Sequence, residues 1–270
     1  MNKIKVGIVG CGTIGSELAF ACQSALKNSL SLVGICDKDG KKSASLKKSL
    51  KGNIPVLELD GIIKKADLVV EAASASVSAD ILKKTIKHGK DILIMSVGGL
   101  LGNEGLLVSA AKAGIKVYLP SGALSGIDGL KSASAGKLES VVLTTRKPVK
   151  GLEGAPYLRE KNIKLSDIKN ETVIFDGNAN EAIKGFPQNV NVCAVLSLAG
   201  IGADKTRVRI VTSPDYTKNV HEVEITGDFG KISTRTESVP SKSNPKTSYL
   251  AALSAIATLG GVAKSVQVGT

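Results

Sequence analysis

The sequence has very few aromatic side chains. Its 270 residues include four Tyr, four Phe and no Trp, so the hydrophobic core must consist mainly of aliphatic residues. Proteins that bind single-stranded nucleic acid commonly stack bases on aromatic side chains. Their scarcity argues against a nucleic-acid partner, although the formal net charge is +12. Much of the positive excess lies between Lys38 and Lys51, where a solvated helix face is expected.

Metal-ligating side chains are also sparse. There are two histidines, and the four cysteines (Cys11, Cys22, Cys36 and Cys193) form no CxxC pair. This pattern argues against a Cys/His metal site and against a disulfide framework, so no bound metal is predicted. Free cysteines suit a reducing compartment, and we expect a cytoplasmic protein.

Long hydrophobic runs are absent as well. The longest stretch of low charge, Tyr249–Ala263, is shorter than the ~20 residues needed to span a bilayer. The chain begins with a strand pattern that leaves no room for a cleavable signal peptide. No membrane partner is expected.

Strand and helix patterns alternate through the first part of the chain. Short, β-branched segments predict buried strands, and apolar residues at helical spacing predict the helices between them. The predicted strands are 3–9, 31–36, 67–72, 91–96 and 115–119, with a short one near Pro55–Val56, and the predicted helices include 13–28, 78–88 and 103–113. This alternation predicts an α/β fold with an N-terminal Rossmann-type doubly wound parallel sheet.

The pattern changes after Gly122. Strands are predicted at 139–147, 171–175, 205–212 and 218–226, with a helix at 186–200. Alternating polarity in the last of these strands indicates one wet face, so a second α+β domain with a mixed or antiparallel sheet is expected. We predict a dinucleotide-binding domain at 1–123, completed by a C-terminal helix at 244–270. A catalytic and dimerisation domain is predicted at 124–243.

The strongest motif is Gly10-Cys11-Gly12-Thr13-Ile14-Gly15, which follows a predicted strand and begins a predicted helix. In that setting Gly10 allows a tight turn, Gly12 lets the backbone approach a pyrophosphate, and Gly15 lets helix and strand pack closely. Thr13 and Ile14 lie at the helix N-terminus, whose free N–H groups attract phosphate. These residues are predicted to bind the cofactor.

Asp37 follows the second predicted strand, about 20 residues after the glycine motif. A carboxylate there binds ribose hydroxyls and favours NAD over NADP. Lys38, Lys41 and Lys42 lie beside it and suit a 2′-phosphate, so use of either cofactor remains open.

Of the two histidines, His88 lies at a predicted helix C-terminus, which is an ordinary structural position. His221 lies on a strand, where alternation places it on the same face as Asn219 and Val223. A single histidine on a strand is more often structural than catalytic, and the residues alone leave both roles open.

Several segments together resemble the L-aspartate dehydrogenase family. They are 7–15 (GIVGCGTIG), 95–100 (MSVGGL), 120–129 (PSGALSGIDG), 186–192 (FPQNVNV), 219–223 (NVHEV) and 244–248 (NPKTS), in order along the whole chain. The resemblance implies oxidation of L-aspartate to iminoaspartate with NAD or NADP. It further implies hydrolysis to oxaloacetate and ammonia, a link to NAD biosynthesis, and a homodimer.

The resemblance also implies site residues. His221 is the expected catalytic acid–base residue, and Ala123 and Asn189 are expected to contact the cofactor. A dicarboxylate substrate needs cations or N–H donors. The candidates for substrate binding are Asn219, Lys246, Thr247 and Ser248, together with Arg146, Arg207 and Arg235.

Two alternatives remain open at this point. One is another two-domain enzyme of amino-acid metabolism, similar to dihydrodipicolinate reductase or homoserine dehydrogenase. The former is expected to carry adjacent histidines, which this sequence lacks, and the latter a longer second domain. The other alternative is a non-catalytic NAD(H)-binding sensor, which needs the glycine motif and Asp37 but not His221.

Overall fold

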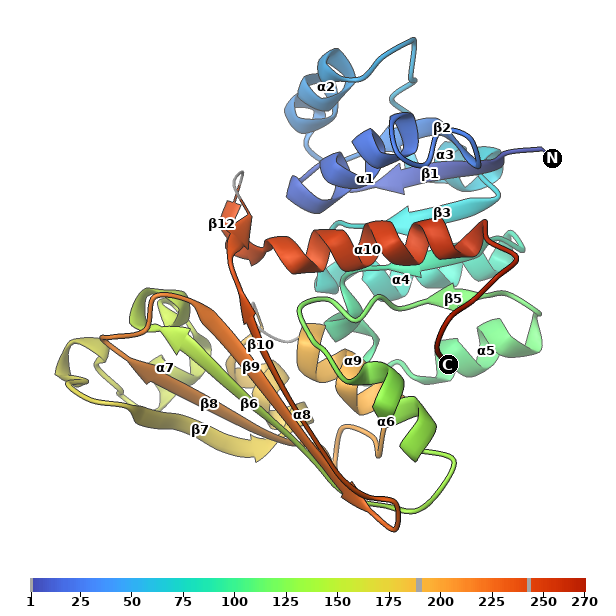
Figure 1. Cartoon of the computed structure of the whole chain (residues 1–270). Coiled ribbons are helices and arrows are strands. Elements are labelled where there is room, and N and C mark those ends of the chain that lie inside the picture. The colour runs from blue at the N-terminus through green and yellow to red at the C-terminus, as the bar shows by residue number, and fades with distance from the viewer. Residues whose placement is uncertain (1, 188–190, 242–243) are drawn as a thin grey trace. The chain divides into compact units, whose positions relative to one another are not determined.

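The computed structural model describes residues 2–187, 191–241 and 244–270, with the backbone alone at 244–246. The chain forms two compact units, drawn in Figure 1. The first comprises residues 1–120 and 251–267, and the second comprises 121–250 and 268–270.

The first unit contains a five-stranded, entirely parallel sheet in the order β2-β1-β3-β4-β5. The strands are β1 (Ile4–Val9), β2 (Leu30–Cys36), β3 (Leu68–Glu71), β4 (Asp91–Ile94) and β5 (Val117–Tyr118). Val56 adds a single parallel bridge to Ile35, so the strand predicted near Pro55–Val56 is reduced to one residue. The strand order reverses at β1, and ligands of open α/β sheets bind beyond the carboxyl ends of the strands at such a point.

Helices connect these parallel strands. They are α1 (Thr13–Gln23), α2 (Gly40–Ser49), α3 (Leu59–Lys65), α4 (Ala75–Lys87) and α5 (Gly105–Lys112), with the short 3₁₀ helix η1 (Val97–Leu100). The predicted helix 13–28 was too long, because the backbone leaves the helical region at Ser24 (φ −122°, ψ −94°). The helix α3 was not predicted.

The last helix, α10 (Tyr249–Val262), contributes to the core of the first unit. Ala255 and Leu259 are fully buried in the same hydrophobic cluster as the β1 side chains Val6 and Ile8. Figure 1 shows α10 alongside the strands of this sheet. The chain therefore returns to its first unit after forming the second.

The predicted C-terminal helix was wrong at both ends. Asn244–Ser248 forms a strand, β12, paired with β11 (Pro240–Ser241), and residues 263–270 are not helical. A residue before proline is disfavoured in the helical region, which agrees with the extended backbone of Asn244.

The second unit contains a mixed five-stranded sheet in the order β10-β9-β6-β8-β7. The strands are β6 (Leu138–Pro148), β7 (Thr172–Asn178), β8 (Arg207–Ser213), β9 (Asn219–Gly227) and β10 (Gly230–Ser238). β6 and β8 are parallel, and the other pairs are antiparallel. Together with the parallel sheet, this confirms the predicted fold class. The strand β10 was not predicted, although its exposed residues alternate with half-buried ones.

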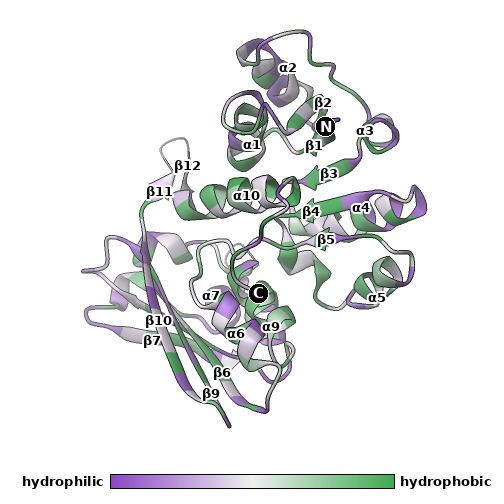
Figure 2. Ribbon diagram, turned by 45° about the vertical axis from the view of Figure 1, so that its right-hand side comes forward, coloured by the Kyte–Doolittle hydropathy of each residue, from purple (hydrophilic) through white to green (hydrophobic). Residues whose placement is uncertain are grey.

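Helices cover one face of the mixed sheet. Its helices are α6 (Ile127–Ala133), α7 (Pro156–Glu160), α8 (Ala179–Gly185) and α9 (Asn191–Ala199), with 3₁₀ turns η2 (Val149–Leu152) and η3 (Leu165–Asp167). Ala182 of α8 and Cys193 of α9 line a small cavity with Leu143 and Thr145 of β6. The helices α8 and α9 therefore pack on the face that carries Thr145. Figure 2 shows hydrophobic and hydrophilic segments alternating along β9 and β10, as a sheet with one covered face requires.

The helix predicted at 186–200 was wrong in its first residues. α8 ends at Gly185, Phe186 and Pro187 are not helical, and α9 begins at Asn191. Pro187 disfavours the helical backbone conformation of the preceding residue, Phe186, and this explains why the helix does not begin there. No helix among the described residues is long and apolar enough to cross a membrane.

Candidate active site

The glycine motif forms a tight turn between β1 and α1. Gly10 has φ +102°, and a Cβ there would lie 2.3 Å from the carbonyl oxygen of Ala72. A Cβ on Gly15 would lie 1.8 Å from the carbonyl oxygen of Gly10. Only glycine fits these two positions. Gly10 has a left-handed backbone conformation, and neither position has room for a Cβ atom.

Gly12 differs from these two glycines because a Cβ there would meet no atom within 4 Å. The fold itself therefore does not need glycine at this position. Gly12 is the N-cap of α1, and Thr13 and Ile14 form its first turn. The open space lies where free helix N–H groups face outward, which fits the pyrophosphate of a dinucleotide.

Asp37 is held beside this turn by two backbone N–H groups. Cys11 N donates to one carboxylate oxygen at 2.7 Å, and Asp39 N donates to the other at 2.8 Å. The side chain is half-buried, while Lys38, Lys41 and Lys42 are exposed. Each carboxylate oxygen retains acceptor capacity, which fits the hydroxyls of a ribose.

Glu71, at the carboxyl end of β3, is a charged residue that sequence reasoning missed. It is fully buried and accepts hydrogen bonds from Ala73 N at 2.8 Å and Ser96 N at 3.0 Å. Burial raises the pKa of Glu71, and these N–H donors oppose that shift. The carboxylate joins the loops that follow β3 and β4, and the β3 loop includes Ala72, which contacts the glycine turn.

His221 lies on β9, between β10 and β6 in the mixed sheet of the second unit. It is register partner to Thr145 on β6 and Thr236 on β10, and it is buried. Its Nδ1 lies 3.1 Å from Thr145 Oγ1. Burial, with a smaller contribution from the charge of Lys147, lowers the pKa of His221 to about 3. The imidazole is therefore neutral at pH 7.

Thr145 and Lys147 are further residues that sequence reasoning missed. They alternate with Arg146 along β6, so they share the covered face with His221, and both are buried. The alternation of the Thr144-Thr145-Arg146-Lys147 segment held this information. Residue type alone does not distinguish the buried Lys147 from the ion-paired Arg146 beside it.

The three arginines proposed for substrate binding are paired elsewhere. Arg146 pairs with Glu222 and Glu171, Arg207 with Asp176, and Arg235 with Glu222 and Glu237. Arg146 and Glu222 occupy the opposite face of the sheet from Thr145 and His221. The sequence candidates are thus part of a network of ion pairs on the polar face.

The loop that contains Ala123 approaches His221 through hydrogen-bonded hydroxyls. Ser125 Oγ lies 2.7 Å from Thr236 Oγ1, and Thr236 is the register partner of His221. Ala123 is buried two residues before Ser125. The structure therefore brings the predicted cofactor-contacting loop close to the predicted catalytic residue.

The remaining predicted residues are placed as follows. Asn219 is half-buried on β9, on the His221 side of the strand's alternation. Thr247 and Ser248 end β12 directly before α10, and the buried Ser248 Oγ has no hydrogen-bond partner in the described part of the chain. Asn189 lies outside the described residues, and so does the side chain of Lys246. His88 caps the C-terminus of α4, where its Nδ1 lies 2.9 Å from Lys84 O.

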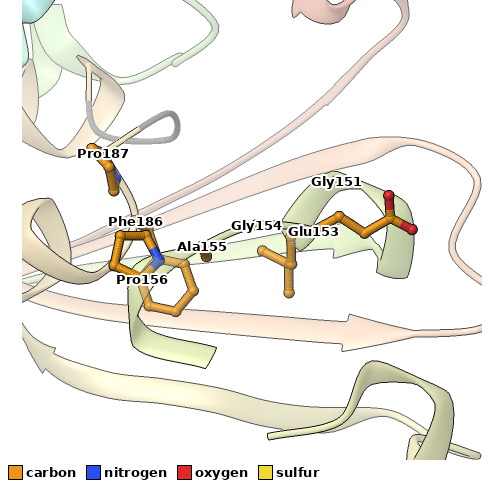
Figure 3. A pocket seen from close by; sticks show the side chains of 8 residues that line it. Gly151, Glu153, Gly154, Ala155, Pro156, Phe186 and Pro187 are labelled. Atoms are coloured by element: carbon orange, nitrogen blue, oxygen red, sulfur yellow. The ribbon is translucent and has the colours of Figure 1, made fainter. Parts of the chain in front are cut away.

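A separate pocket of the second unit is shown in Figure 3. It is lined by residues 151–156 together with Phe186 and Pro187. The Glu153 carboxylate points away from the Phe186 ring. The lining offers no converging polar side chains, so the covered face that carries His221, Thr145 and Lys147 is the stronger candidate site.

The fold and these contacts define the class of protein. A Rossmann-type dinucleotide-binding unit precedes a mixed-sheet unit that carries a buried histidine, and this arrangement fits an NAD(P)-dependent oxidoreductase. The family model "Homoserine dehydrogenase, NAD binding domain" matches residues 10–120, and "Aspartate dehydrogenase, C-terminal" matches residues 128–262.

Relatives identify the family. L-aspartate dehydrogenase of Methanococcoides burtonii is 48% identical over 271 residues, which cover 99% of this chain and 100% of the relative. L-aspartate dehydrogenase of Methanosarcina acetivorans is 46% identical, again over 99% of this chain and 100% of the relative. The crystal structure of aspartate dehydrogenase from Thermotoga maritima matches with a TM-score of 0.74 and 26% identity, over 99% of this chain and 100% of that one. The chain belongs to the L-aspartate dehydrogenase family.

Proposed function

We propose that this protein oxidises L-aspartate to iminoaspartate with NAD or NADP, and that His221 is its acid–base residue. The proposal is supported by full-length identities of 44–48% to several proteins named L-aspartate dehydrogenase. The observation that carries the catalytic role is the buried neutral imidazole of His221, oriented by Thr145. A non-catalytic sensor would have no use for this arrangement.

The reaction removes a hydride from Cα and a proton from the amino group. The nicotinamide, when bound, accepts the hydride. The residues that would hold the dinucleotide are Gly10, Gly12, Thr13, Ile14, Gly15 and Asp37. Ala123 and Asn189 are proposed as further cofactor contacts. His221 would accept the proton through Nε2, because Thr145 occupies the Nδ1 side. Water then converts iminoaspartate into oxaloacetate and ammonia.

Orientation and proton transfer are separate contributions of the site. Thr145 orients the ring through its hydroxyl, and burial keeps the imidazole neutral. General acid–base catalysis of this kind is typically worth about 10² to 10⁴ in rate. Asn219, Lys246, Thr247 and Ser248 are proposed as substrate contacts.

The test is formation of reduced nicotinamide by the purified protein with L-aspartate and either cofactor. L-homoserine, L-glutamate, L-alanine and D-aspartate serve as comparison substrates. Turnover confined to L-aspartate, with oxaloacetate and ammonia consumed in the reverse direction, supports the proposal. Inactivity with L-aspartate in both directions and with both cofactors contradicts it.

A variant of His221 separates the enzyme from a sensor. His221→Ala is expected to abolish most turnover while leaving the dissociation constant for NADH unchanged. Equal turnover by this variant would contradict the catalytic role. His88→Ala provides the matched control, since His88, the other histidine of the chain, lies at the C-terminus of α4 in the first unit.

Three broader features complete the proposal. A homodimer and a cytoplasmic location are proposed from family membership. Supply of iminoaspartate for NAD biosynthesis is the proposed metabolic role. Light scattering of the purified chain tests the oligomeric state.

A further inference from the structure

Lys147 is a buried cation close to the proposed catalytic histidine. It is two residues after Thr145 on β6, so both side chains lie on the face that carries His221. Side chains that are diagonal neighbours across antiparallel strands lie within reach of each other. Only 9% of Lys147 is exposed.

No carboxylate in the described part of the chain pairs with Lys147. The ion pairs of those residues involve other lysines and arginines, and no acidic group opposes the desolvation that lowers the pKa of Lys147 to about 8. Its backbone, in contrast, is anchored, since Thr212 Oγ1 donates to Lys147 O at 2.7 Å. A charged group that is both desolvated and unpaired is costly, and such groups are concentrated where a ligand supplies the opposite charge.

The neighbouring cations are already satisfied. Arg146, the adjacent residue on β6, faces the other side of the sheet and pairs with Glu222. Arg207 and Arg235 each pair with acidic residues as well. Among the described side chains near His221, Lys147 is therefore the cation that is left for an anionic ligand.

We propose that Lys147 binds a carboxylate of the substrate beside His221. This inference rests on the proposed function for the identity of the substrate, but its geometry depends only on the second unit. An ammonium on a covered sheet face offers three donors to a carboxylate oxygen, and Thr145 and Thr212 keep its strand in register with both neighbours. The substrate class that fits is a small amino dicarboxylate.

Substrate binding at Lys147 also affects His221. The positive charge of Lys147 contributes to the low pKa of His221. A carboxylate that neutralises this charge raises the proton affinity of the imidazole in the complex that reacts. Lys147 would thus couple recognition of the anion to the strength of the base.

The experiment measures binding of succinate, a dicarboxylate that cannot be oxidised at an amine, to the full-length protein with bound NADH. Lys147→Met removes the charge and keeps the length, Lys147→Arg restores a charge, and Lys150→Met is the matched control at an exposed lysine. Calorimetry gives the dissociation constants. KM and kcat for L-aspartate are measured with the same four proteins.

We expect Lys147→Met to weaken succinate binding by at least about 30-fold and to raise KM for L-aspartate more than it lowers kcat. Lys147→Arg should recover much of the affinity, Lys150→Met should match the unmodified protein, and all should bind NADH equally. Succinate binding by folded Lys147→Met within threefold of the unmodified protein would overturn the proposal. If Lys147→Met does not fold, equal weakening by Lys147→Arg and Lys150→Met overturns it.

The two proposals fail in different ways. Lysine-dependent succinate binding without oxidation of L-aspartate contradicts the proposed reaction and leaves the anion site standing. Oxidation of L-aspartate with an unchanged KM in Lys147→Met contradicts the anion site and leaves the reaction standing.

Discussion

The imidazole of His221 lies 3.1 Å from the hydroxyl of Thr145, measured between Nδ1 and Oγ1, and both residues are buried on paired strands. When Nδ1 carries the proton and donates to the hydroxyl, Nε2 is free to accept a proton from the substrate. In this tautomer Nε2 can act as a base.

Thr145→Val preserves the shape of the side chain and removes the hydroxyl. We expect kcat to fall by about tenfold to a hundredfold, because the ring loses its orienting partner. Cofactor affinity should not change. Thr145→Ser, which restores a hydroxyl, should recover most of the activity, and failure to do so would argue that packing rather than hydrogen bonding matters. Steady-state kinetics of both variants provide the comparison.

The buried charge of Lys147, which is proposed to bind the substrate, is expected to lower the stability of the folded protein. Burial lowers its pKa from 10.5 to about 8, so below pH 8 the folded and unfolded chains both carry the charge and the folded state bears the full desolvation cost. Lys147→Met should therefore stabilise the protein at pH 7, by on the order of 3 kcal/mol.

The gain from Lys147→Met should shrink as the pH rises from 8 towards 10.5, because the native lysine then releases its proton. Urea unfolding at pH 7 and pH 10 measures the two differences. Destabilisation at pH 7 would indicate that the charge is compensated within the protein.

His221 predicts a loss of stability in mild acid. Burial and the charge of Lys147 lower its pKa from 6.5 to about 3. Between these values the unfolded chain binds a proton that the folded chain does not, so the free energy of unfolding decreases as the pH falls from 6.5. The urea midpoint of His221→Gln should depend less on pH between 7 and 4.5 than that of the unmodified protein.

Substitution of Gly12 and of Gly15 by alanine is expected to have different effects. Gly12→Ala adds a methyl group into open space, so the melting temperature should change little while the dissociation constant for NADH rises more than about tenfold. Gly15→Ala should destabilise the fold by about 3 kcal/mol, since its Cβ would overlap the carbonyl oxygen of Gly10. Thermal unfolding and NADH titration separate the two effects. Normal NADH binding by Gly12→Ala would contradict the assigned pyrophosphate position.

Asp37 predicts a change in cofactor preference. Asp37→Ser removes the charge next to Lys38 and Lys42, and it should raise KM for NAD while lowering the ratio of KM for NADP to that for NAD. Lys38→Gln should change the ratio in the opposite direction. An unchanged ratio in Asp37→Ser would show that the ribose is recognised elsewhere.

Local pattern was sufficient for much of the fold. Each strand of the parallel sheet is a short β-branched segment, and the glycine motif directly follows the first of them. Periodicity and turn chemistry were therefore enough to predict the parallel sheet and its cofactor-binding turn. Strand β10 and helix α3 were missed because short amphipathic segments give weak periodic signals. The extent of α1 and α10 was misjudged since helix ends depend on local backbone geometry and on Pro245 rather than on apolar spacing.

The sequence by itself determined the dinucleotide-binding turn and singled out His221 through family resemblance, because these depend on residues close together or on a matching motif. Only the tertiary structure decided which charges are compensated. Arg146 and Lys147 are neighbours in the chain, yet the pleat of β6 sends one to an ion pair with Glu222 and the other to the buried face beside His221. A cation's role depends on what faces it across the sheet, and pairing between distant strands establishes that contact.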